Sequence, residues 1–258
     1  MSKRSSLASP AARFLLPALL VLVLGGCQTV SLDDVTGALG GKSEAAGKAD
    51  SRPDLDGLRE RYRAKPSDPA IALEYGKALR ETGQRGQAVA VMEQAVLAHP
   101  SNKALLAGYG RALADNGNFQ QAFDVLSRAH TPEDPDWRIL SAQGAALDQL
   151  GRNEDAQQYY ASALKIVPDE PQVLSNLGLS YVLQNNLPRA EETMRRAYQR
   201  NPTDSRVRAN LALVLGLEGK QAEAETIVKA DLPPDQAEAK VTALRQLLTK
   251  KQQQRADK

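Results

Sequence analysis

The chain has 258 residues, with 33 lysines and arginines, 31 aspartates and glutamates, and only 4% aromatic side chains. Its single cysteine excludes a disulfide framework, and one cysteine with two distant histidines offers no ligand set for zinc. The near-neutral charge and the scarcity of aromatics argue against a nucleic-acid interface, which needs a clustered basic face.

Residues 1–26 have the pattern of a secretory signal peptide. Three basic residues precede an apolar run over residues 14–24. Eleven apolar residues are too few to cross a membrane as a stable helix. Removing residues 1–26 takes away three basic and no acidic residues, which leaves 30 basic against 31 acidic residues.

Leu24-Gly25-Gly26-Cys27 resembles the lipobox of bacterial lipoproteins. The resemblance implies cleavage before Cys27 and lipidation of that residue, so that acyl chains rather than a helix hold the protein to a membrane. Gln28 follows the cysteine where an aspartate would mark the inner membrane. By resemblance to lipoprotein sorting, the expected location is the outer membrane, facing the periplasm.

Residues 27–53 are rich in Gly, Ser, Ala, Asp and Lys, and they predict a flexible tether. The sequence GALGGKS at residues 37–43 resembles a phosphate-binding loop, but it is one residue short of the motif. No β-strand is predicted before it. We therefore expect no nucleotide and no other cofactor.

Residues 54–66 predict a short polar helix that ends at Pro66. This proline lies 34 residues before Pro100, which closes the first complete unit of the repeat described next. The segment is interpreted as an N-terminal capping half-repeat, whose polar face would cover the open end of a repeat array.

A unit of 34 residues occurs five times within residues 67–231. Apolar residues recur at helical spacing on both sides of a polar break, so each unit is predicted to be a helical hairpin. The small residues of one column should lie where the two helices cross closely. Three columns that keep this step are Gly76, Gly110, Gly144, Gly178 and Ala212; Leu79, Leu113, Leu147, Tyr181 and Leu215; and Ala88, Ala122, Ala156, Ala190 and Ala224.

The break inside each hairpin contains a residue suited to the left-handed conformation that ends a helix. Four units have glycine there, and the fourth unit has asparagine. These residues are Gly83, Gly117, Gly151, Asn185 and Gly219.

Residues 232–258 begin with a leucine and Pro233-Pro234 and continue with apolar residues at helical spacing, among them Val241, Leu244 and Leu248. They predict a C-terminal capping helix followed by a polar tail.

The columns of residues 67–231 resemble the tetratricopeptide repeat, both in period and in the order of leucine, glycine, tyrosine, alanine, large apolar residue, alanine and proline. The resemblance implies an all-α tetratricopeptide-repeat superhelix of about five helical hairpins with terminal capping helices. The first helices of the hairpins would line a groove. We find no motif that would place catalytic groups together, and we expect no enzyme activity.

We predict a partner-binding site in the groove of the last two repeats. Their first helices place one asparagine and two leucines at i, i+3 and i+7, which share one face. The leucines would receive apolar side chains of an extended or helical partner segment, and the asparagine amides would pair with its backbone. These residues are Asn176, Leu179 and Leu183 and, 34 positions later, Asn210, Leu213 and Leu217.

Earlier repeats carry different residues in the two leucine columns, so the groove would run from charged to apolar. These residues are Lys77, Glu81, Arg111, Asp115, Ala145 and Gln149. Two alternatives stay open for the apolar end. In one, the C-terminal helix fills the groove; in the other, the leucines simply pack between repeats.

Taken whole, the order of signal, lipobox, tether, repeats and helical end resembles the TadD-type lipoproteins of the tight-adherence (Flp) pilus. That resemblance implies a scaffold for assembly of the pilus secretion machinery, pilotin-like toward the outer-membrane secretin. Other envelope lipoproteins share these features. The alternative is a general envelope adaptor, for example for peptidoglycan hydrolases or for another pilus or secretion system.

Overall fold

The computed structural model describes residues 53–230 and 232–256. The chain divides into two units, Met1–Val30 and Ser31–Lys258, and every described residue belongs to the second. The predicted signal peptide, the lipidation site Cys27 and the tether up to residue 52 lie outside the described residues. Within the described ranges the backbone forms helices and turns, with one isolated bridge between Thr131 and Asp134.

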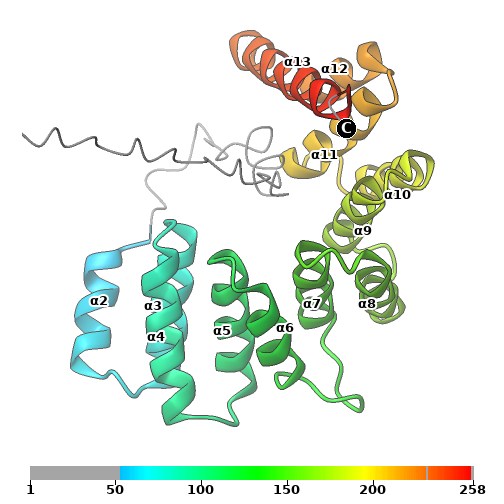
Figure 1. Cartoon of the computed structure of the whole chain (residues 1–258). Helices are drawn as coiled ribbons and strands as arrows, with labels where there is room; N and C mark the ends of the chain where they lie inside the picture. Colours follow the sequence, from blue (N-terminus) through cyan, green and yellow to red (C-terminus); the bar gives the residue numbers. More distant parts are fainter. Residues whose placement is uncertain (1–52, 231, 257–258) are drawn as a thin grey trace, which may run out of the picture. The chain divides into compact units, whose positions relative to one another are not determined.

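Twelve helices follow one another along the described residues (Figure 1). Ten of them form five hairpins, α3/α4 to α11/α12, and one helix lies at each end of the array. The helices are α2 (Leu55–Ala64), α3 (Pro69–Glu81), α4 (Arg85–Ala98), α5 (Lys103–Asp115), α6 (Phe119–Ser127), α7 (Trp137–Gln149), α8 (Asn153–Ile166), α9 (Pro171–Leu183), α10 (Leu187–Arg200), α11 (Ser205–Leu217), α12 (Gln221–Lys229) and α13 (Pro234–Ala256).

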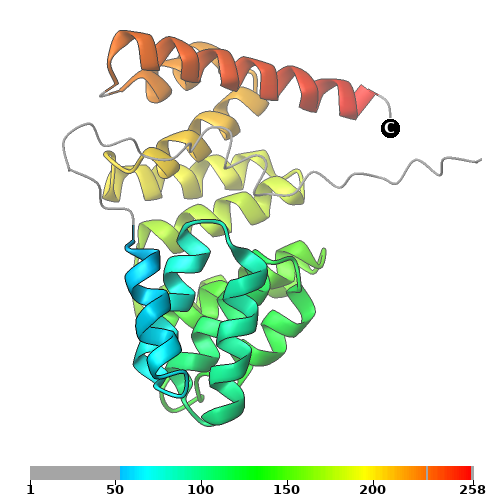
Figure 2. The ribbon, with the colours of Figure 1, turned by 90° about the vertical axis from the view of Figure 1, so that its left-hand side faces the viewer.

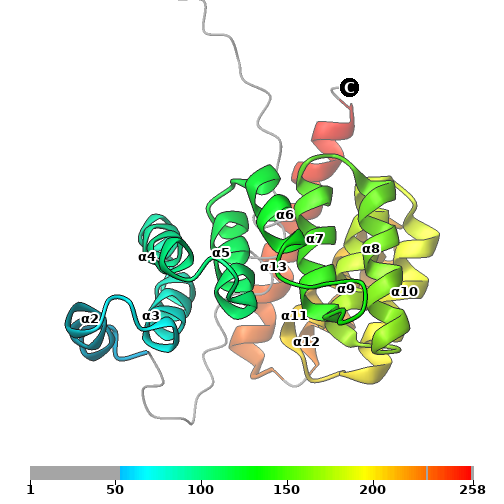
Figure 3. The ribbon, with the colours of Figure 1, turned by 90° about the horizontal axis from the view of Figure 1, so that it is seen from below.

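The hairpins stack in chain order. From α4 to α10, each second helix packs against the first helix of its own hairpin and against the first helix of the next one. In addition, the first helices α3, α5, α7, α9 and α11 contact one another in series. Figure 3 shows α4, α8 and α10 beside their partners α3, α7 and α9. This arrangement confirms the predicted all-α repeat superhelix, and it makes one continuous face from the first helices.

The column of small residues that begins with Gly76 lies at the crossing point of the two helices in each of the first four hairpins. A Cβ atom built on Gly178 would lie 2.8 Å from Cε and 2.9 Å from Cγ of Met194, closer than real Cβ atoms approach other atoms. Gly76, Gly110 and Gly144 face Met92, Leu126 and Tyr160 in the same way. Each partner comes 16 positions after its glycine, so the second helix has its own 34-residue column of large side chains.

The first helices end as the sequence predicts. Gly83, Gly117, Gly151 and Gly219 have φ between 75° and 86°, and Asn185 has φ 58°. In each turn the amide that follows this residue donates to the carbonyl five positions earlier, as from Asn186 to Tyr181 at 2.9 Å. The column of Leu79 and Tyr181 therefore has two roles, because its side chains pack and its carbonyls accept the bond that closes the helix.

A further column was not anticipated. Every first helix begins after an acidic or amide residue whose side chain accepts hydrogen bonds from the exposed amides of the first turn. For example, Asp68 Oδ1 accepts from the amides of Ala70 at 2.9 Å and Ile71 at 3.1 Å. The column is Asp68, Asn102, Asp136, Glu170 and Asp204.

The two end helices cover the open sides of the array. Tyr62 of α2 packs on Tyr75 of α3, with ring centroids 5.4 Å apart, and its hydroxyl donates to Gln94 at 2.9 Å. At the other end α13 contacts α11 and α12 (Figure 2). Leu248 of α13 fills the space over Gly216.

Candidate functional site

The continuous surface formed by α3, α5, α7, α9 and α11 is called the groove face below. Neighbouring first helices touch along it, so a side chain on this face either bonds to the adjacent repeat or remains available to a partner. Residue type at each position decides between these outcomes.

The six residues of the predicted partner site differ in exposure. Leu179, Asn210 and Leu213 are 5%, 2% and 1% exposed, whereas Leu183 is 43% exposed. Asn176 and Leu217 are partly buried. Only Leu183, Asn176 and Leu217 present surface to a partner in this conformation.

The two predicted asparagine amides are already bonded within the chain. Asn176 Nδ2 donates to Ser141 Oγ at 3.1 Å, and Asn210 Nδ2 donates to Ser175 Oγ at 2.8 Å. Both bonds join a first helix to the preceding first helix. Packing between repeats, the alternative left open by the sequence, is therefore favoured for Leu179, Asn210 and Leu213. Partner binding by the six residues as a set stays a prediction.

The opposite end of the groove face contains an open pocket of about 560 Å³ over α3, α5 and the start of α7. Its floor includes Leu73, Met92 and Gly108. A Cβ atom on Gly108 would lie 2.8 Å from Cδ1 of Leu73, so Leu73 packs directly against the backbone at this glycine. Charged side chains form most of the remaining lining: Lys77, Arg80, Glu81, Arg111, Asp115, Asp136 and Arg138.

All three carboxylates of the pocket are engaged. Asp115 accepts from Nε of Arg80 at 2.6 Å, and Glu81 lies 3.7 Å from the ammonium of Lys77. Asp136 accepts from the backbone amide of the second residue of α7 at 2.7 Å, where it caps that helix.

Two guanidinium groups of the pocket have no such partner. Within the described residues, Arg111 and Arg138 make no side-chain hydrogen bond or ion pair, although Arg138 lies 4.5 Å from the centre of the Trp137 ring. Arg111 is partly buried. Its burial and then the neighbouring charge of Arg80 hold the pKa of its guanidinium below the usual range, and the carboxylates of Asp136 and Asp115 offset only part of that decrease.

A buried carboxylate ties together the third and fourth repeats. Asp148 accepts hydrogen bonds from Tyr160 at 2.9 Å, Asn153 at 2.8 Å and Ser180 at 2.7 Å. Burial raises the pKa of Asp148, and these three bonds offset part of that rise. Because every donor is uncharged and the carboxylate is enclosed, we assign the cluster to the stability of the array.

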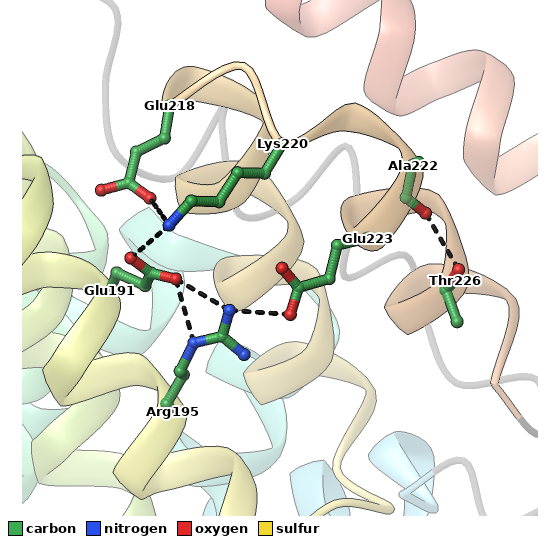
Figure 4. Close-up of polar contacts among 7 residues, drawn as sticks. All are labelled: Glu191, Arg195, Glu218, Lys220, Ala222, Glu223 and Thr226. Carbon is green, nitrogen blue, oxygen red and sulfur yellow. Dashed lines mark hydrogen bonds and ion pairs between the residues drawn. The ribbon is translucent and has the colours of Figure 1, made fainter.

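An ion-pair cluster joins the fourth and fifth hairpins (Figure 4). Glu191 of α10 lies between Lys220 at 2.7 Å and Arg195 at 2.8 Å. Arg195 also bonds to Glu223 of α12 at 2.7 Å, and Lys220 lies 2.9 Å from Glu218. The bond from Lys220 is the main cause that lowers the pKa of Glu191 to about 2. This cluster also acts between repeats.

Sequence reasoning placed Lys77, Glu81, Arg111 and Asp115 on the groove face but assigned the site to the apolar end. It missed the other seven lining residues, among them Gly108, Asp136 and Arg138. The signal for Gly108 was available, because glycine replaces a larger residue in the column that later contains Asn176. Nothing in the pattern marked Arg138 as unpaired.

Stacked helical hairpins whose first helices share one face define a helical-repeat protein. Residues 73–136 and 141–205 match a tetratricopeptide-repeat family, and residues 205–229 match a second family of the same repeat. Residues 73–136 and 141–205 together make up half of the sequence, so the chain belongs to the tetratricopeptide-repeat family. A comparison with curated proteins found no match.

Solved structures show the same fold. TTC0263, a thermophilic tetratricopeptide-repeat protein of Thermus thermophilus, has 20% identity and a TM-score of 0.55 over 62% of this chain and 88% of its own. The human IFIT1 dimer with m7Gppp-AAAA has 15% identity and a TM-score of 0.59 over 70% of this chain, which spans 46% of IFIT1. At these identities the likeness concerns the fold alone.

Two further properties concern residues 53–230 and 232–256. None of their helices combines the length and apolar character that a membrane span requires. Their His, Cys, Asp and Glu side chains form no group of three or more that would hold a metal ion.

Proposed function

We propose that the chain is a lipid-anchored scaffold that mediates protein–protein interactions during assembly of the tight-adherence (Flp) pilus machinery. The observation that carries this proposal is the repeat array itself, with one continuous groove face that contains an open, charged pocket. A tetratricopeptide-repeat array is typically an interaction scaffold, and the lipobox at Cys27 supports attachment to a membrane.

The anchor and the array have separate roles in this proposal. Acyl chains on Cys27 hold the protein to the periplasmic face of the outer membrane, and more than one chain gives firm attachment. Residues 28–53 then connect the anchor to the groove face, which binds a segment of the partner. The partner is the outer-membrane secretin, toward which the protein acts as a pilotin does.

The groove face offers a partner two chemically different surfaces. The charged pocket lies over α3 and α5, and the exposed side chain of Leu183 with the partly buried Asn176 and Leu217 lies at the other end. A segment that crosses the face would meet charge first and apolar surface later.

Co-purification from native membranes tests the proposal, with the lipidated Cys27 form as bait and Cys27→Ser as control. We expect the secretin and other pilus components to be recovered with the wild-type protein, and to be lost with the control, which should remain as uncleaved precursor. Recovery of peptidoglycan hydrolases without pilus components would contradict the pilus assignment and support the adaptor alternative. An unmodified Cys27 in a chain that still begins at Met1 would contradict the anchor.

A further inference from the structure

We infer that helix α13 binds α13 of a second copy of this chain, through an exposed stripe of uncharged polar side chains. The stripe lies outside the groove face, so the inference is independent of the partner proposed for that face. The four residues of the stripe are Thr242, Gln246, Thr249 and Gln253.

Helix α13 occupies the place of the first helix of a sixth repeat. Ser180 of α9 bonds to Asp148 of α7, and two 34-residue steps beyond this pair Leu248 of α13 packs over Gly216 of α11. Like the first helices before it, α13 contacts the preceding first helix and the preceding second helix, which are α11 and α12. It therefore continues the stack in register.

This sixth first helix has no second helix beside it within the described residues. Each earlier first helix meets the second helix of its own hairpin, in the first four along the column of small residues that begins with Gly76. In α13 that column continues at Gln246, and the column of Leu79 continues at Thr249. Both side chains are exposed, and Figure 2 shows α13 as the outermost helix at this end of the stack. The side of α13 that corresponds to a hairpin interior is therefore open.

The length of α13 extends this open side. Continuing the 34-residue step from α11 would give a helix over residues 239–251, whereas α13 runs from Pro234 to Ala256. Gln253 takes the place of the glycine that ends four of the other first helices, and the helix continues through it. The stripe thus has positions i, i+4, i+7 and i+11 on one uninterrupted helical face.

The stripe borders an open hollow of about 400 Å³ that a second helix can approach at low cost. Its only charged lining residue is Arg245, which is already paired with Glu225 of α12 at 2.6 Å. Burying a charge without a partner is far costlier than burying an amide or a hydroxyl that finds a hydrogen bond. An uncharged stripe on a helix that has charges elsewhere therefore suits contact with another helix.

The chemistry of the stripe favours a copy of itself. A glutamine amide and a threonine hydroxyl each contain a donor and an acceptor, so two such stripes can satisfy one another. An apolar helix would find no apolar surface here, and a highly charged helix would find no free counter-charge.

The order of the residues fits a two-fold axis, which pairs each residue reciprocally with its counterpart. In an antiparallel pair centred beside Gln246, that residue lies against its own copy and Thr242 lies opposite Thr249. The exposed carboxylate of Glu238 then lies opposite Gln253, from whose amide it can accept a hydrogen bond.

Sedimentation equilibrium of the purified full chain in detergent, over a wide concentration range, measures the association. One pair of helices buries less than a standard interface, so we expect a weak equilibrium between monomer and dimer. Gln246→Glu should raise the Kd at least about tenfold, because two like charges meet at the axis. Gln236→Glu is the control and should associate as wild type does, since Gln236 is exposed on α13 but lies outside the stripe.

A mixture of two variants distinguishes pairing at the axis from a general effect of charge. Gln246→Glu and Gln246→Lys should associate more tightly with each other than either does with itself, because opposite charges then meet. Melting temperatures of all variants establish that each chain is folded.

Photo-crosslinking in cells identifies the occupant of the stripe. A benzophenone side chain in place of Gln253 should give a product with the mass of two copies of this chain, and one in place of the exposed Gln158 of α8 should not. A chain that stays monomeric, equal association of folded Gln246→Glu, or crosslinks from position 253 to a different protein alone would each overturn the inference. None of these outcomes affects the scaffold function, which is tested separately by recovery of pilus components from membranes.

Discussion

The two ends of the groove face differ although their helices follow one pattern. In the fourth and fifth repeats, Asn176 and Asn210 donate hydrogen bonds to serines of the preceding repeat. These bonds join neighbouring first helices along the line where they meet, which is called the seam. At the first and second repeats the same column contains Glu74 and Gly108. Glycine has no side chain to form such a bond; Leu73 and Met92 pack over it, and all three residues line the pocket.

The difference shows that this column contributes to how adjacent first helices are joined; in the third repeat it contains Ala142, whose side chain makes no hydrogen bond either. An asparagine opposite a serine gives a hydrogen bond that fixes adjacent repeats, and its burial makes the bond costly to remove. A glycine in the same place leaves a floor of apolar atoms and lets charged neighbours define the surface.

The same glycine substitution should have different severity inside a hairpin and on the pocket floor. Gly178→Leu places new atoms against Cγ and Cε of Met194 and should lower the free energy of unfolding by about 3 kcal/mol. Gly108→Leu meets Cδ1 of Leu73 and the end of Met92, which can shift toward the open pocket, and should cost about 1 kcal/mol. Urea denaturation checks both values. Equal stability of Gly178→Leu and wild type would refute the crossing-point assignment.

Removing a buried carboxylate should cost more than removing one from the charged pocket. Asp148→Ala leaves the hydroxyls of Tyr160 and Ser180 without an acceptor and should lower the free energy of unfolding by about 2–3 kcal/mol. Asp115→Ala breaks a partly exposed ion pair with Arg80 and should cost at most about 1 kcal/mol. Similar losses, measured by thermal and urea denaturation, would mean that the two ends of the face are equally rigid.

The seam itself can be tested at one column. Asn210→Ala removes the buried bond to Ser175 and should cost about 1–2 kcal/mol. Glu74→Ala, its counterpart in the first repeat, breaks only an exposed pair with Arg61 and should cost less than about 0.5 kcal/mol. If Asn210→Ala melts like wild type but loses the envelope partner, the asparagine belongs to the binding surface after all.

Two carboxylates should respond to pH with opposite sign. The folded pKa of Asp148 is raised from 3.8, so its contribution to the free energy of unfolding falls as pH rises from 3.8 through the folded value. The folded pKa of Glu191 is lowered from 4.5 to about 2, so its contribution is complete above 4.5 and is lost as pH falls toward 2. Water screens the Glu191 cluster, and its effect should stay below about 1 kcal/mol.

Urea titrations between about pH 3 and pH 7 measure these contributions as differences from wild type. The free energy of unfolding of wild type relative to Asp148→Asn should decrease with rising pH, and that of wild type relative to Glu191→Gln should increase. A common sign for both variants would contradict the assigned causes of the two pKa shifts.

Much of the fold could be predicted because the repeat tests each assignment several times. The first helices of the five hairpins end at four glycines and Asn185, which form one column with a period of 34 residues. A second column with this period places glycines such as Gly178 at the close crossings of four hairpins. The capping column that includes Asp68 and Asp204 is equally periodic, because every first helix needs an acceptor for the exposed amides of its first turn.

The site could be predicted less well, because function depends on departures from the repeat. The pattern places Leu213 and Lys77 on the same face, but it does not say that Leu213 is buried and Lys77 exposed. That outcome depends on how closely each pair of first helices approaches and on which acidic side chains are already paired. A column of residues with a period of 34 specifies neither the distance between two first helices nor the pairing of their acidic side chains.

Site-specific photo-crosslinking in cells tests whether a protein partner binds the groove face at its charged end. A benzophenone side chain would replace Lys77 at the pocket, Leu183 at the apolar end, and Arg85 at the exposed start of α4, away from the pocket. The account predicts a crosslinked envelope protein from Lys77 and none from Arg85. Crosslinks from Arg85 with none from Lys77 or Leu183 would contradict it.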